Sequence, residues 1–148
     1  MINYYPIWWD TSVTVYNKYE DPQTNIITWH KTVIDDCFWQ NNFNRYKMGE
    51  VEIQSDSIIC RIKEDSRFLE KQDWVKIPND KMNNYFTLSQ GDIIIKGNVD
   101  EDIDEYTSGK RSSDIIAKYK WQGCMVIDKL SINTGLGRGL PHYHVEGV

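Results

Sequence analysis

The sequence contains no long apolar run and no secretion signal. None of its stretches approaches the roughly 20 apolar residues that a membrane-spanning helix needs. Residues 1–10, MINYYPIWWD, have neither a basic start nor a continuous apolar segment. We therefore expect a protein that is made in a cytoplasm, is soluble there and has no membrane partner.

Cysteine is scarce and widely spaced. Cys37, Cys60 and Cys124 are too far apart to form the CxxC pair of a zinc or redox site. Each lies in an apolar stretch, so the sequence predicts three buried free thiols in a reducing compartment.

Basic charge is also in short supply. The chain has 17 Lys and Arg against 22 Asp and Glu, a formal net charge of -5, and no basic cluster longer than residues 110–111. A protein that binds nucleic acid through its phosphates needs a basic face, so tight or sequence-specific DNA binding is excluded. The densest charge is acidic, at residues 100–105, and predicts a solvated loop.

The common catalytic motifs are missing too. The chain has no GxSxG and no HExxH. Asp35 and Asp36 are adjacent, so on a strand they point to opposite faces and cannot work as an acid–base pair. A cysteine nucleophile acting with His30 stays open, although the cysteines are predicted to be buried. We expect no enzymatic activity and no cofactor.

His142 and His144 are the best metal-ligand candidates that the sequence offers. Two residues apart, they share one face of a strand and could reach one ion. A third ligand would have to be His30 or a carboxylate such as Glu146 or Asp128, and nothing in the sequence brings them together. Because two ligands do not make a site, we expect no bound metal and favour a sheet-edge or interface role for the pair.

Residues 134–139, TGLGRG, resemble a phosphate-binding loop in their glycine spacing alone. The segment leads into Leu140, Pro141 and a further strand, with no helix start and no Lys-Ser/Thr pair. We interpret it as a hairpin loop whose tip leaves Arg138 free to meet a partner.

The apolar patterning that is present is mainly that of β-strands. Strands are predicted at residues 12–19, 26–40, 57–62, 89–99, 124–133 and 141–147, with a turn at 20–25. Period two in residues 26–40 places one set of side chains on a common face, and the segment is long enough to require a bend near residues 35–36. That set comprises Ile27, Trp29, Val33, Cys37 and Trp39.

One helix is predicted, at residues 112–120, with Ser112 or Ser113 as its N-cap. Residues 41–56 have no clear period and predict a long connection with at most a short strand, and residues 63–86 are irregular. The length of 148 residues fits one domain, 1–148. The expected fold is mainly β, a small antiparallel β-barrel or sandwich with long loops and one short α-helix.

Large apolar side chains outside the expected strands are candidate interface residues. Residues 1–10 form an aromatic N-terminal segment that either folds back over the barrel or docks on a neighbour. The full set of interface candidates is Tyr4, Tyr5, Trp8, Trp9, Phe68, Leu69, Trp74 and Arg138.

Several segments together resemble a family of small proteins from tailed phages and prophages of Gram-positive bacteria. They are TVYNKY (14–19), WHKTVIDDCFWQ (29–40), DSIICRI (56–62), LSQGDIIIKGNVD (88–100) and LPHYHVEG (140–147), and their order spans nearly the whole chain. The resemblance implies a neck protein, similar to head-completion (stopper) proteins of the head–tail connector.

The resemblance also implies partners and a location. Such a protein would form a homo-oligomeric ring between the portal–adaptor complex and the tail, in the virion neck. Double-stranded DNA would pass through the lumen without specific binding, which the acidic charge suits. The alternatives are a tail terminator or tail-completion protein, a host-facing regulatory protein, and a small metal-binding enzyme using His142, His144 and His30.

Overall fold

Six antiparallel strands close into a barrel in the order β1-β2-β3-β6-β5-β4. The computed structural model describes residues 5–134 and 140–148, with the backbone alone at 42–46 and 53–56. The strands are β1 (Thr11–Glu20), β2 (Ile27–Met48), β3 (Val51–Lys63), β4 (Ile93–Lys96), β5 (Cys124–Asn133) and β6 (His142–Gly147). The predicted mainly β fold is confirmed, as a barrel and not a sandwich.

Two apolar clusters pack against β1 and β4, one inside the barrel and one on its outer surface. The interior cluster takes Val13 and Val15 from β1 and Ile94 from β4. An outer cluster takes Ile93 and Ile95 from β4 and packs them under the helix α2 (Ser112–Tyr119). The sequence of β4 does not alternate because both of its faces are buried.

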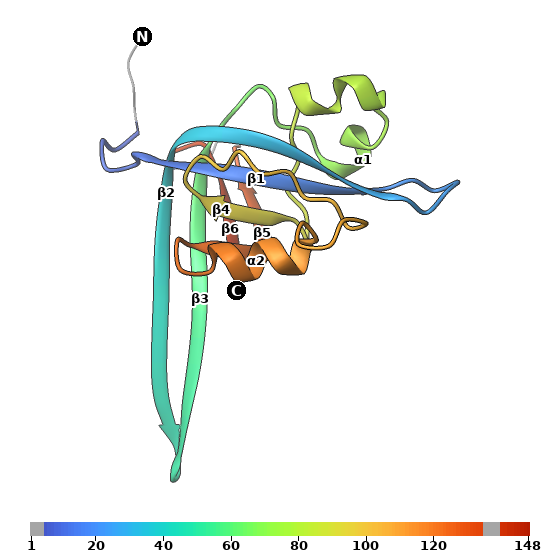
Figure 1. Ribbon diagram of the computed structural model, residues 1–148. Coiled ribbons are helices and arrows are strands. Elements are labelled where there is room, and N and C mark those ends of the chain that lie inside the picture. Colours follow the sequence, from blue (N-terminus) through green and yellow to red (C-terminus); the bar gives the residue numbers. More distant parts are fainter. Residues whose placement is uncertain (1–4, 135–139) are drawn as a thin grey trace.

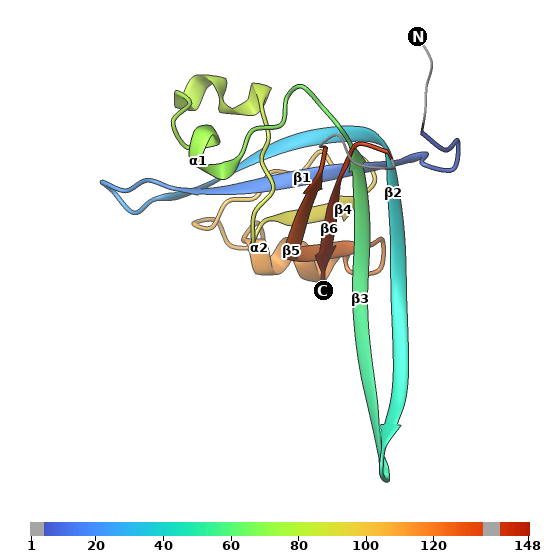
Figure 2. The ribbon, with the colours of Figure 1, turned by 180° about the vertical axis from the view of Figure 1, so that it is seen from behind.

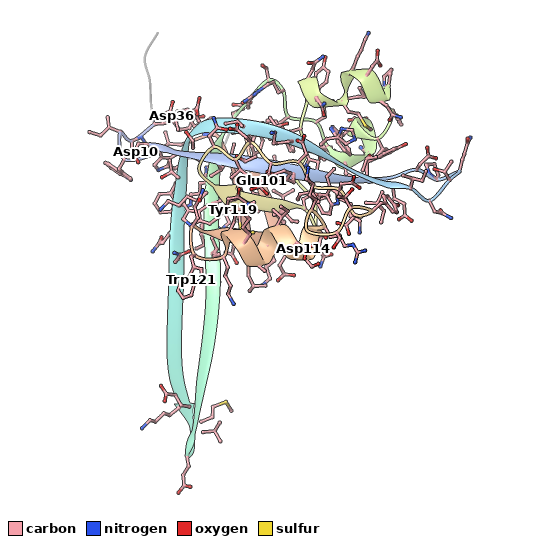
Figure 3. The ribbon with its side chains drawn as sticks, viewed as in Figure 1. Asp10, Asp36, Glu101, Asp114, Tyr119 and Trp121 are labelled. Atoms are coloured by element: carbon pink, nitrogen blue, oxygen red, sulfur yellow. The ribbon has the colours of Figure 1, made fainter. Side chains whose placement is uncertain are left out.

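The helix α2 was correctly predicted, but its cap was not. Arg111 is the N-cap, and its backbone N–H donates to Asp114 Oδ2 at 3.3 Å. The Asp114 carboxylate reaches back over the first turn, so the helix starts without a serine cap. Beside it, the acidic segment 100–105 is a loop as expected, and Tyr119 donates to Glu101 at 2.8 Å (Figure 3).

Strand β2 bends at Asp36, whose φ is 59°, so the predicted bend is confirmed (Figure 1). The irregularity changes which side chains face inward. Ile34 and Cys37 both enter the interior cluster, whereas Trp29 packs against the outer one. The predicted common face of Trp29 and Cys37 is therefore wrong, because a strict period of two does not survive a bulge.

Residues 41–56 are not a connection, contrary to prediction. They extend β2 and β3 into a two-stranded hairpin whose register runs from Asn41↔Ile58 to Met48↔Val51. The hairpin projects well beyond the barrel, seen from both sides (Figures 1 and 2). Residues 42–57 are called the arm below. An arm outside the barrel has no core face to impose an apolar alternation, so periodicity could not mark it.

The irregular region 63–86 contains two short helices that were not predicted, α1 (Lys71–Trp74) and the 3₁₀ helix η1 (Asn79–Asn84). Neither is long enough to show a helical period in the sequence. Within the described part of the chain, no helix has the length and apolar character needed to cross a membrane.

Candidate interaction surfaces

His142 and His144 share the outer face of β6, as predicted, while Tyr143 and Val145 point into the core. His144 Nε2 lies 3.0 Å from Glu146 Oε1, and Arg61 Nε donates to His144 Nδ1 at 3.3 Å. Both ring nitrogens of His144 are thereby engaged within the protein, which makes this residue part of a surface hydrogen-bond network.

His142 is held by a different set of neighbours. Its Nδ1 lies 2.6 Å from Leu140 O, and its ring meets the Trp9 ring edge-on with the centroids 5.9 Å apart. The centroids of the His142 and His144 rings are 6.4 Å apart. Contact with Trp9 gives His142 a role in holding the N-terminal segment against β6.

His30 does not join the other two histidines. Its Nδ1 lies 3.0 Å from Asn83 Oδ1, and its ring packs edge-on against Trp74 and Tyr19. Over residues 5–134 and 140–148, apart from the side chains that are not described, no group of three potential ligands is positioned to hold a metal ion. The three candidate ligands therefore serve separate contacts.

The three cysteines are buried free thiols, as predicted. A side-chain hydrogen bond with Cys37, reinforced by burial, raises the pKa of Cys60. Burial raises the pKa of Cys124 to about 11. Neither Cys60 nor Cys124 is a thiolate near neutral pH, and a thiol is a poor nucleophile.

The N-terminal aromatic segment divides into a packed part and an exposed part. Trp9 is 6% exposed and packs against Tyr5 and Phe38. Tyr5 donates its hydroxyl to Pro141 O at 2.6 Å. Trp8 is 66% exposed, so it is the interface candidate of this segment that a partner can reach. Tyr4 lies outside the described residues.

The interface candidates of the irregular region are buried to different degrees. Phe68 packs on Tyr143, with ring centroids 4.2 Å apart, and so extends the interior cluster. Leu69 is half-buried, and its N–H donates to Phe86 O at 2.9 Å. Trp74 is fully buried between α1 and the β1–β2 hairpin. Arg138 lies outside the described residues.

A buried carboxylate, Asp92, links the segment before β4 to β1. It accepts hydrogen bonds from Asn17 Nδ2 at 2.9 Å, from Lys18 N at 3.0 Å, and from the N–H and hydroxyl of Ser89 at 3.1 and 3.0 Å. Burial raises the pKa of Asp92, against the opposing effect of these donors. With four donors already bound, this group is a structural anchor.

The arm is a surface that sequence reasoning missed. Within the described part of the chain its backbone edges are open, because β1 pairs with β2 no further than Cys37 and β6 pairs with β3 only from Ile58 onward. At its tip, Met48 is 65% and Val51 63% exposed. Gly49, with φ 68°, was the available signal, since a glycine turn between two apolar residues is typical of a hairpin.

A shallow groove lies at the base of the arm. It has a volume of about 240 Å³ and is lined by Asn41, Ser57, Ile58, Lys120, Trp121, Gln122, Gly123, Cys124 and Val148. Trp121 is 98% exposed on its rim, at the end of α2 (Figure 3). Monomeric surfaces rarely leave a tryptophan so uncovered.

A family model described as "Family of unknown function (DUF6751)" matches residues 8–148. The chain therefore belongs to this family. No curated protein and no solved structure matches the chain.

Proposed function

We propose that this chain of the DUF6751 family is a virion structural protein of a tailed bacteriophage. It would form the head-completion (stopper) ring of the head–tail connector, between the portal–adaptor complex and the tail. The observation that carries the proposal is the arm projecting from a closed barrel, with two open strand edges and an exposed apolar tip.

The open edges of the arm support an assembly role. A soluble protein normally hides or blunts such edges, because unpaired backbone groups attract other strands. The arm projects beyond the barrel, and its described tip residues Met48 and Val51 are exposed and belong to neither apolar cluster (Figure 1). A feature that folding does not need, and that exposes pairing groups, is suited to contacts with neighbouring subunits.

The net negative charge of the chain supports a ring through which DNA passes without being bound. Acidic residues outnumber basic ones, 22 to 17. Several acids are also held within the fold, for example Glu101 by Lys118 and Glu105 by Trp29 Nε1 at 3.0 Å. A ring with net negative charge repels phosphates, so DNA could pass through its lumen without sticking.

Mass spectrometry of purified virions tests the proposal directly. The chain is expected in every particle at a constant, ring-like copy number relative to the portal protein. Its absence from washed particles would refute a connector role and favour a host-facing regulatory protein.

Shortening the arm is expected to abolish incorporation while the barrel stays folded. Replacing residues 43–56 by Asn-Gly retains every pairing from Phe38↔Arg61 to Asn42↔Ser57 and supplies a two-residue hairpin turn. We expect the free energy of unfolding to change by less than about 1 kcal/mol, because the replaced segment projects beyond the barrel. Virions made with this variant should lack it. A shortened chain that enters particles at the normal copy number would show that the arm has no part in assembly.

A further inference from the structure

We propose that the arm tip of one copy of this chain docks into the groove at the arm base of the next copy. This inference rests on the proposed ring-forming function and names the surfaces that join its subunits. One partner surface is the pair Met48 and Val51, and the other is the groove beneath Trp121.

The tip presents a compact apolar knob. Met48 and Val51 are cross-strand partners, so their side chains emerge on the same face of the hairpin. Both are more than half exposed. Methionine is flexible enough to fill an irregular depression. The six residues 47–52, KMGEVE, carry one Lys and two Glu, which leaves the tip with a net negative charge.

The groove is complementary to that knob in polarity and charge. Ile58, Cys124 and Trp121 give it an apolar surface, and Lys120 stands on its rim. None of the described residues that line it is Asp or Glu. Lys96 is a second basic residue near the groove, since its backbone N–H donates to the carbonyl of the lining residue Gly123 at 2.8 Å. A fully exposed tryptophan next to a depression is the kind of residue that dominates interface energy.

The geometry of the arm excludes docking within one chain. The hairpin is continuous from Asn41↔Ile58, beside the groove, to Met48↔Val51 at the tip. At about 3.3 Å per residue, the tip lies roughly 20 Å from the groove of its own chain. An arm tip that fills the groove must therefore belong to another copy. Because tip and groove are different surfaces, the contact is heterologous and repeats from copy to copy, which generates a closed ring when the rotation closes.

Cross-linking between two variants that each carry one introduced surface cysteine tests the contact. Lys47→Cys, next to Met48, and Gln122→Cys, which lines the groove, change exposed side chains and leave the proposed contact residues in place. Both variants also carry Cys124→Ala, because Cys124 lines the groove; the other two native cysteines are fully buried. Mixed in equal amounts near the solubility limit and treated with a short bis-maleimide, the two variants should give at least tenfold more covalent dimer than either variant alone. Ser108→Cys, in an exposed loop, replaces Gln122→Cys in the control mixture.

The outcomes separate this inference from the function on which it rests. Dimer from Lys47→Cys in the Cys124→Ala background alone would indicate pairing of tip with tip and overturn the inference, as would a mixture that gives no more product than the Ser108→Cys control. Chains found in virions at ring-like copy number would still support the connector function in either case. Efficient mixed cross-linking of a chain that is absent from virions would retain the contact and refute the connector.

Charge reversal gives a second readout that does not depend on cysteine. Glu50→Lys or Lys120→Glu alone should weaken self-association at least tenfold at low salt, measured by analytical ultracentrifugation. The double variant should recover most of the loss, because the pair of charges is restored in the opposite sense. Additive losses in the double variant would show that Glu50 does not face Lys120.

Discussion

Trp74→Ala is expected to lower the free energy of unfolding by about 3 kcal/mol or more and to expose residues 64–86 to proteases. Trp74 is fully buried and packs edge-on against Tyr19 and His30, with ring centroids 6.1 and 5.5 Å away. Removing a buried Trp leaves a cavity that costs about 3–5 kcal/mol. The α1 helix is too short to persist by itself, so its attachment depends on this side chain.

Urea unfolding and limited proteolysis measure the two effects separately. Val75→Ala is the matched control, because Val75 is the next residue and is 38% exposed, and it should change stability by less than about 0.5 kcal/mol. New cleavage sites in Trp74→Ala should fall between residues 64 and 86, ahead of any cut within the barrel strands. A variant as resistant to proteolysis as the parent would show that Phe68 and Phe86 hold the region without Trp74.

The strands of the barrel were predictable because each has a buried face. Strand β1 is buried on both faces from Val13 to Asn17, so it was recognised by its β-branched and aromatic residues and by the turn that follows it. In β6, Tyr143 and Val145 alternate with half-buried neighbours, and this leaves a period of two in the sequence. The helix α2 was predictable in the same way, through Ile115, which packs into the outer cluster. Periodic patterns of this kind appear in the sequence where a strand or helix packs one face against the core of the same chain.

The surfaces that we propose for assembly show no such periodic pattern in the sequence. The arm is paired only with itself beyond Asn41↔Ile58, so its residues are free of the constraint that makes strands recognisable. Trp121 sits in a turn, where a single exposed aromatic residue has no periodic context. The bend at Asp36 was expected from strand length, but its effect on which side chains face inward depends on a left-handed backbone conformation that an aspartate rarely adopts.

Removing the Asp92 carboxylate is expected to destabilise the protein by about 3 kcal/mol in Asp92→Ala. The backbone N–H groups of Lys18 and Ser89 would lose their acceptor, and each buried donor left unpaired costs about 1–3 kcal/mol. Asn17 would keep its bond to Thr87 O, so the link between β1 and residues 87–92 would weaken without disappearing. Asp80→Asn, at an exposed position, is the control and should be nearly neutral.

The difference in free energy of unfolding between the parent and Asp92→Asn should change with pH, because only the parent can protonate a carboxylate at this position. Burial raises the pKa of Asp92 in the folded protein above its unfolded value. The folded state then binds a proton more tightly than the unfolded state, so the contribution of Asp92 to stability rises as the pH falls from the folded pKa toward the unfolded one. Asp92→Asn lacks this pH-dependent contribution, because asparagine does not titrate. The stability advantage of the parent over Asp92→Asn, from urea unfolding, should therefore grow between pH 7 and pH 4. An advantage that shrinks over this range would mean that the four donors outweigh burial and hold the folded pKa below the unfolded value.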